Sequence, residues 1–117
     1  SFLIIAVQGF TQWVYQEFKC LFLDRDNKVL GIYNLSRGGT AGTIVDIKLL
    51  MVAALKAKAH AIILAHNHPS GNLKPSIQDN ELTKKIREAS KFLDVQLLDH
   101  IIVTKKDYFS FSDEGIL

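Results

Sequence analysis

The stretch that organises this chain is HNHPSGNLKPSIQD, at residues 66–79. Three potential metal ligands, His66, His68 and Asp79, fall within it. The apolar run AIILA at residues 61–65 comes just before it and is typical of a strand buried on both faces. Because alternate residues of an extended chain point to the same side, we expect the two imidazoles to share one side at the end of that strand.

A helix is predicted to follow the two histidines. Proline and glycine between residues 69 and 75 interrupt regular structure, and apolar residues then recur at roughly helical spacing. These apolar residues are Ile77, Leu82, Ile86, Ala89 and Leu93. Ser76 is the expected N-cap of a helix over about residues 77–92, and Asp79 falls in its first turn. A strand end and a helix start that converge can present two histidines and an aspartate while leaving one tetrahedral position for water. We therefore interpret the stretch as a catalytic zinc site.

The spacing of these residues resembles the JAMM signature of the MPN metallopeptidase superfamily. The matching pattern is His66-x-His68, then seven residues, then Ser76-x-x-Asp79. The fuller string, HNHPSG followed by PS and D, resembles the RadC branch. Asn67 also fits that branch, whereas the wider superfamily commonly has Ser or Thr between the two histidines.

The resemblance extends upstream through QEF at residues 16–18 and downstream through LDHIIV at residues 98–103. It covers about residues 16–117 and leaves residues 1–15 outside the clear match. It implies an α/β fold, the MPN sandwich of the cytidine-deaminase-like type, with a mixed β-sheet flanked by two main helices.

The same resemblance implies a zinc-dependent hydrolase of peptide or isopeptide bonds, and the RadC branch does not point to one substrate. Glu17 would be the general base and the proton carrier, and Ser76 would donate a hydrogen bond to the oxyanion. The residues by themselves leave simpler roles open. Glu17 could be a solvated carboxylate at a strand end, and Ser76 could be only a helix cap.

Length and composition indicate one compact domain over residues 1–117. Hydrophobic residues make up 48% of the sequence, and the mean hydropathy is +0.12, which excludes a disordered chain. Cys20 is the single cysteine, so an intramolecular disulfide and a Cys-rich zinc knuckle are both excluded. Its apolar neighbours favour a buried packing role, and a cytoplasmic location fits best. Because the sequence begins without Met, we expect a fragment of a longer chain.

The charge pattern gives no indication of an extended basic surface for binding nucleic acid. The formal net charge is +2, and the 14 basic residues are interleaved with acidic ones. The resemblance implies a peptide or protein substrate as the partner, and we expect any DNA association only through regions outside these residues. No apolar run approaches the ~20 residues of a membrane span, and residues 2–7 are interpreted as a strand, not as a signal peptide.

The rest of the chain supplies the other elements of the expected sheet. Residues 17–23 and 29–35 are predicted to form a hairpin through the turn cluster DRDNK. Apolar residues at helical spacing from Ile47 to Leu55 predict an amphipathic helix. Further strands are expected at residues 2–7, 95–104 and 108–111. The glycine-rich residues 36–43 lack the ending of a phosphate-binding P-loop and are interpreted as a flexible rim beside the site.

Asp99, His100 and His60 are the remaining candidates for polar chemistry. Adjacent strand residues face opposite ways, so at most one of Asp99 and His100 can support the zinc site from behind; an ordinary polar pair is the alternative. His60, near a helix end, is interpreted as a surface residue.

Two other functions stay open beside the hydrolase. RadC relatives carry a DNA-repair name, so a non-catalytic DNA-repair-associated module is the second hypothesis. A third is an MPN scaffold whose metal site has decayed. The complete set of ligands, base and hydroxyl favours the first. The string HNH is not the dispersed HNH nuclease motif, and the cysteines that zinc deaminases need are absent from the sequence.

Overall fold

The chain folds as a mixed five-stranded sheet with two helices in the computed structural model, which describes residues 17–37, 45–68 and 70–117. The elements in chain order are β1 (Glu17–Leu23), β2 (Val29–Arg37), α2 (Ile47–Lys56), β3 (Ala61–Asn67), α3 (Ile77–Phe92), β4 (Gln96–Val103) and β5 (Tyr108–Ser110). The strand order is β2-β1-β3-β4-β5, and only the β3–β4 pair among the described strands is parallel. The predicted α/β class is confirmed.

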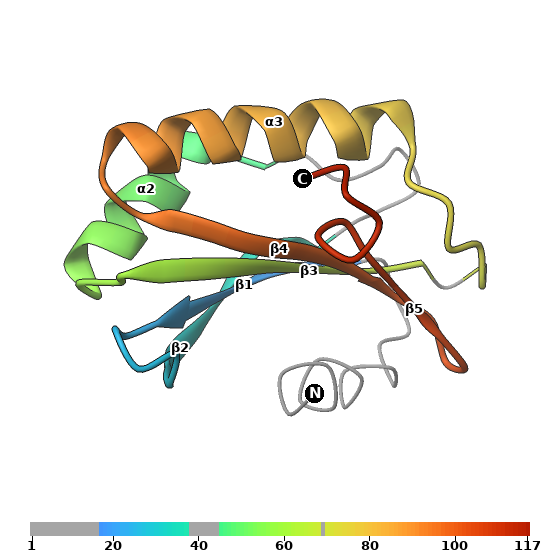
Figure 1. Ribbon diagram of the computed structural model, residues 1–117, viewed down its shortest axis with the longest axis horizontal. Helices are drawn as coiled ribbons and strands as arrows, with labels where there is room; N and C mark the ends of the chain where they lie inside the picture. Colours follow the sequence, from blue (N-terminus) through green and yellow to red (C-terminus); the bar gives the residue numbers. More distant parts are fainter. Residues whose placement is uncertain (1–16, 38–44, 69) are drawn as a thin grey trace.

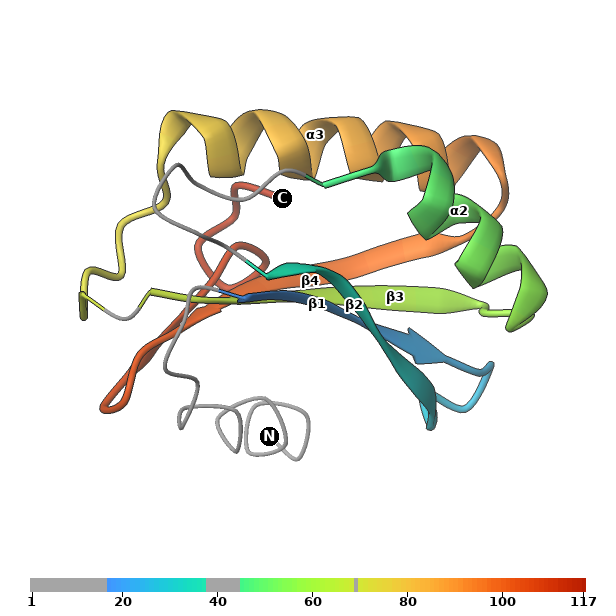
Figure 2. The same ribbon diagram turned by 180° about the vertical axis from the view of Figure 1, so that it is seen from behind.

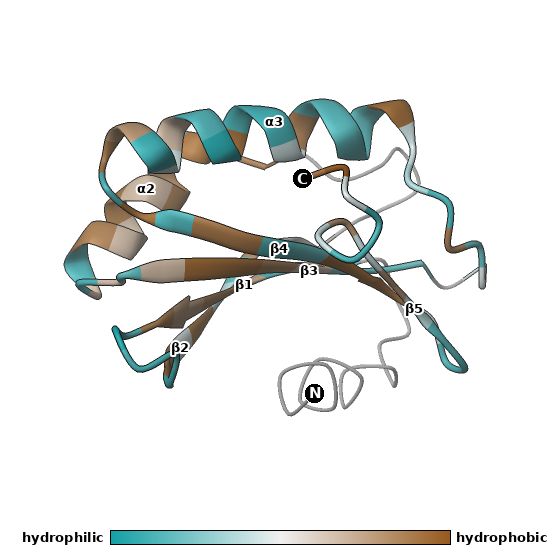
Figure 3. Cartoon of the chain, viewed as in Figure 1, coloured by the Kyte–Doolittle hydropathy of each residue, from teal (hydrophilic) through white to brown (hydrophobic). Residues whose placement is uncertain are grey.

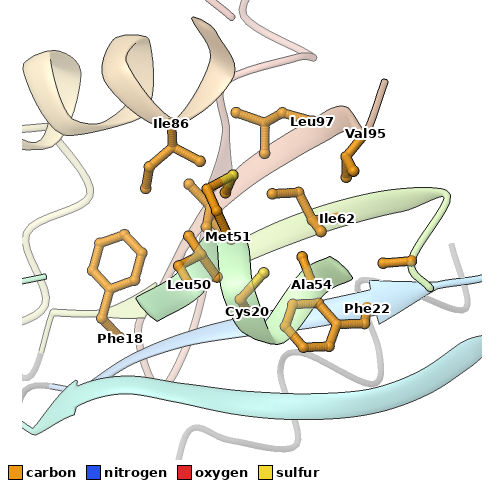
Figure 4. Packing of buried hydrophobic residues seen from close by; sticks show 12 residues of the cluster. Phe18, Cys20, Phe22, Leu50, Met51, Ala54, Ile62, Ile86, Val95 and Leu97 are labelled. Atoms are coloured by element: carbon orange, nitrogen blue, oxygen red, sulfur yellow. The ribbon is translucent and has the colours of Figure 1, made fainter. Parts of the chain in front are cut away.

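Both described helices lie on the same face of the sheet, with α3 running along it and α2 near one end (Figure 1). The view from behind shows the same arrangement (Figure 2). Leu50, Met51 and Ala54 of α2 and Ile86 of α3 are buried against the strands (Figure 4). The strands contribute to this cluster Phe18, Cys20, Phe22, Ile62, Leu64 and Leu97. Burial of this apolar surface holds the helices on the sheet.

The central strand β3 is buried at every position, which explains the continuous apolar sequence of its residues 61–65 (Figure 3). Ile62 and Leu64 face the helices, and the alternate residues belong to a second apolar cluster. That cluster consists of Leu21, Leu23, Ala61, Ile63, Ala65, Ile101 and Val103. His66 continues the Ile62–Leu64 series, so strand alternation directs it toward the helix face.

The predicted hairpin is confirmed, and its turn has a clear local cause. Asp24 Oδ1 accepts hydrogen bonds from the backbone N–H groups of Asp26 and Lys28, at 2.8 and 2.9 Å. Asn27 takes a positive φ of 60°, a conformation that asparagine tolerates better than most residues. β2 runs to Arg37, two residues beyond the predicted end.

The two predicted helices are confirmed, and each has a side-chain N-cap. Asp46 accepts from the Leu49 N–H at 3.1 Å, and Ser76 caps α3. The buried positions of α3 differ from its apolar pattern, because Ile77 is 78% exposed. The residues that α3 buries are Asp79, Thr83, Ile86 and Ser90. The first two turns of α3 therefore present polar groups to the sheet.

Two predictions lie outside the described residues: the strand at residues 2–7 and most of the glycine-rich rim at residues 36–43. Within the described parts of the chain, no helix combines the length and apolar character needed to cross a membrane.

Candidate metal centre

His66 lies at the end of β3 and faces α3. It is the strand partner of Phe18 on β1 and of Ile102 on β4. Its ring stacks on Phe18, with centroids 4.9 Å apart, and the residue is only 2% exposed. The ring is therefore fixed by packing on a rigid part of the sheet.

His68 is the first residue after β3, and its backbone continues the strand direction, because its N–H donates to the Val103 carbonyl at 3.0 Å. The Nδ1 atom of His68 lies 2.6 Å from the Asn72 carbonyl oxygen. A carbonyl can only accept, so Nδ1 carries the proton and Nε2 of the neutral ring keeps a lone pair. Gly71, at a φ of +86° that favours glycine, helps to return the chain toward His68. A ring N–H donated to a backbone carbonyl, as in His68, is a common way of orienting metal-binding histidines.

Asp79 is held by a reciprocal capping box at the start of α3. Its N–H donates to Ser76 Oγ at 3.0 Å, and its Oδ2 accepts from the Ser76 N–H at 2.8 Å. Its Oδ1 lies 3.2 Å from His66 Nδ1, and its Oδ2 lies 3.5 Å from His68 Nε2. One ligand atom from each of the three residues lies within 4.8 Å of the other two. The structure thus brings together the three residues that the sequence selected.

The electrostatics of the cluster favour a cation between these groups. Burial alone would raise the pKa of the Asp79 carboxyl, but the adjoining His66 and His68 rings and the Ser76 N–H hold its pKa far below the usual range. The Asp79 carboxylate in turn raises the pKa of His68, against the opposing effect of burial. An ionised carboxylate facing two imidazole nitrogens can hold a metal ion where it would otherwise hold protons.

Glu17 is the first residue of β1 and lies opposite Asn67, because Phe18 pairs with His66. Strand alternation places its side chain on the face opposite Phe18, and its carboxylate lies 3.7 Å from Lys19 Nζ. The group of three ligand atoms within 4.8 Å of one another does not include Glu17. The Glu17 backbone therefore lies beside Asn67, next to the two histidines, whereas its carboxylate lies beside the Lys19 ammonium and not among the ligand atoms.

Ser76 is exposed, and its hydroxyl oxygen caps α3. A hydroxyl that accepts one hydrogen bond still carries its own proton for donation. The cap role is therefore compatible with the predicted role toward an oxyanion, which stays a prediction.

The side chains of Asp99 and His100 point to opposite faces of the sheet, as strand alternation requires. Asp99 accepts from the Ser110 hydroxyl at 2.5 Å and from the Ser112 N–H at 2.9 Å, so it shapes the chain after β5. His100 is fully buried on the face toward α3, with its ring centroid 6.3 Å from that of His66. Burial lowers the pKa of His100 to about 3, and the nearby His66 acts in the same direction, so the ring is neutral.

Thr83 is a residue of the centre that the sequence interpretation missed. Its hydroxyl lies 2.6 Å from the Asp79 carbonyl oxygen and 2.5 Å from His100 Nδ1. One signal was available, because a residue four positions after Asp79 lies on the same face of a helix.

A separate pocket of about 600 Å³ lies toward the other end of α3, and its lining includes His60, Arg87 and Lys91. The predicted metal ligands are not among its lining residues. Cations in the last turns of a helix interact favourably with its dipole. His60 is exposed, as expected for a surface residue.

Comparison with known proteins identifies relatives over nearly the whole chain. The family model described as "RadC-like JAB domain" matches residues 3–116, so the match begins further upstream than residue 16. A "UPF0758 protein" of Flavobacterium johnsoniae is 52% identical over 87% of this chain and 44% of its own length. Proteins of the same name from Porphyromonas gingivalis and Nitrosococcus oceani are 46% and 42% identical, over 87% and 88% of this chain and 45% and 46% of their own lengths. The chain spans less than half the length of these relatives.

Proposed function

The chain belongs to the RadC-like JAB domain family, and on this premise we propose that it is a zinc-dependent hydrolase of peptide or isopeptide bonds. The observation that carries the proposal is the convergence of His66, His68 and Asp79 from the end of β3 and the start of α3. Two imidazoles and one carboxylate are the protein ligands of a well-known class of catalytic zinc sites, which keep a fourth position open.

The donor set supports this metal because each ligand is already oriented. His68 presents Nε2, since its Nδ1 proton is committed to the Asn72 carbonyl. Asp79 is ionised and anchored by the Ser76 N–H. When bound, zinc would lower the pKa of a coordinated water and polarise the substrate carbonyl.

Glu17 is the proposed general base, which takes a proton from the attacking water and returns it to the leaving amine. The ligand residues cannot serve, because their lone pairs would be committed to the metal. To act, the Glu17 carboxylate must leave Lys19 and turn toward the centre. The 3.7 Å separation from Lys19 Nζ is longer than a hydrogen bond, so this movement breaks no charge-assisted hydrogen bond between the two groups.

Ser76 is the proposed oxyanion donor. It lies at the N-cap beside Asp79, and its hydroxyl proton is available while the oxygen accepts from the Asp79 N–H. A positioned donor of this kind contributes a factor of about 10²–10³ to the rate of acyl transfer.

The proposal is tested by turnover of a peptide and isopeptide library with the protein in three states: as purified without a metal column, stripped by a chelator, and reloaded with zinc. We expect cleavage in the first state, loss of cleavage after stripping, and recovery on reloading. Cleavage that persists at the full rate in protein shown to be metal-free would contradict the proposal.

A further inference from the structure

We propose that Thr83 and His100 are positioning residues of the metal centre, which hold the Asp79 backbone in place relative to His66. The inference rests on the proposed metal-binding function of this site. Asp79 is carried by α3 and His66 by the sheet, and the two positioning residues would hold one relative to the other.

The hydrogen bonds around Thr83 form a directed chain. Its hydroxyl has one proton, which it donates to the Asp79 carbonyl oxygen at 2.6 Å. With that proton committed, the Thr83 hydroxyl oxygen acts as the acceptor from His100 Nδ1, which lies 2.5 Å from it. The neutral His100 ring therefore carries its proton on Nδ1, and the chain runs from His100 through Thr83 to Asp79.

His100 is anchored in the sheet beside the strand that bears His66. It is the β4 partner of Leu64 on β3. Its ring stacks on Phe111, with centroids 4.5 Å apart and planes 14° apart. Phe18 contacts both His100 and His66, with ring centroids 5.2 and 4.9 Å away. The bond from His100 to Thr83 thus connects this aromatic layer directly to α3.

Packing alone does not account for a histidine at this position. His100 Nε2 is buried and has no hydrogen-bond partner among the described residues. An acceptor left in that state costs free energy that a phenylalanine in the same ring stack would avoid. What the histidine provides is the Nδ1 donor to Thr83.

The metal centre needs such a connection because its ligands come from two elements. His66 is in β3 and His68 comes directly after it, whereas Asp79 is in α3. The Ser76 cap fixes the Asp79 carboxylate only within the helix. The bond between Thr83 and His100 fixes the helix turn that carries Asp79 against the sheet.

The test compares two disruptive and two conservative variants. His100→Phe keeps the ring stack but removes the donor, and Thr83→Val keeps the shape but removes the hydroxyl. His100→Asn places an amide N–H near the position of Nδ1, and Thr83→Ser keeps the hydroxyl. Zinc affinity is measured by competition with a chromophoric chelator, ligand geometry by the visible spectrum of the Co(II)-loaded protein, and stability by melting of the metal-free protein.

We expect His100→Phe and Thr83→Val to bind zinc about 10–100-fold more weakly and to change the Co(II) spectrum. His100→Asn and Thr83→Ser should stay close to the parent in both measurements. His100→Asn loses the ring and should melt below His100→Phe, yet it should bind zinc more tightly. A purely structural role would instead make affinity follow stability.

Parental affinity and spectrum in both His100→Phe and Thr83→Val would overturn this inference and leave the proposed function standing. A parent protein that binds no metal would overturn both. The double variant should lose no more affinity than either single disruptive variant, because both changes break one chain. Additive losses would contradict the shared chain.

Discussion

The backbone N–H of Glu17 donates to the side-chain oxygen of Asn67 at 2.6 Å, which ties the first residue of β1 to the residue between the two histidines. The neighbouring pair, Phe18 and His66, is in register across the same two strands. The Glu17 backbone is thus held opposite Asn67, the residue between the two histidines, while strand alternation directs its carboxylate to the other face of the sheet, beside Lys19.

We expect Glu17→Gln to bind zinc and fold like the parent but to hydrolyse a cleavable peptide about 10²–10⁴-fold more slowly. Glutamine keeps the size and hydrogen bonding of glutamate and removes its basicity. The measurement is single-substrate turnover with a hit from the peptide library. Glu88→Gln, at an exposed position of α3, is the matched control and should turn over normally. Parental turnover by Glu17→Gln would show that another group is the base.

Two substitutions of Ser76 separate its cap role from its proposed oxyanion role. Ser76→Ala should cost about 0.5–2 kcal/mol of stability, whereas Ser76→Gly should cost only a few tenths, since glycine is tolerated at N-caps. Both remove the hydroxyl and should slow hydrolysis by about 10²–10³. The two quantities are read by chemical denaturation and by turnover. If Ser76→Gly cleaves at the parental rate, Ser76 is only a cap.

Local sequence signals were enough to predict the elements that carry the candidate metal ligands. The apolar run before His66 identified a fully buried strand, and the Ser76 and Asp79 spacing identified the start of α3. Each signal depends on neighbours within a few residues, through strand alternation or helix capping. The ligand residues could therefore be selected before their geometry was known.

Features that depend on contacts between distant residues were not predictable in this way. The bond between Thr83 and His100 joins residues 17 positions apart, and no local pattern marks it. The apolar spacing of α3 suggested a buried face that included Ile77, but packing against the sheet turns that residue outward. The Glu17 carboxylate is directed by strand alternation and by Lys19, whereas the motif specifies only its position in the chain.

Cys20 should be inert toward thiol reagents in the folded protein. It is 0% exposed in the apolar cluster under α2, and burial raises the pKa of its thiol far above the usual range, so almost no thiolate forms. A chromogenic disulfide reagent should react with one thiol per chain in denaturant and with none under native conditions. Rapid native labelling would place Cys20 outside the core.

These 117 residues should bind duplex DNA only non-specifically, at roughly 10⁻⁴–10⁻⁶ M and with strong salt dependence. The net charge of +2 arises from basic and acidic residues that are interleaved along the sequence. Fluorescence anisotropy with two unrelated duplexes at two salt concentrations measures both quantities. Sub-micromolar binding that distinguishes the duplexes would favour the DNA-associated alternative.

The most direct measurement of the central claim is the zinc content of the protein purified without a metal column. The parent should contain one zinc per chain, because His66, His68 and Asp79 are already brought together. His68→Ala should lose most of that zinc, whereas His60→Ala, which changes an exposed histidine outside the centre, should retain it. One zinc per chain in His68→Ala, or none in the parent after incubation with excess zinc, would contradict the assignment of these residues as a zinc site.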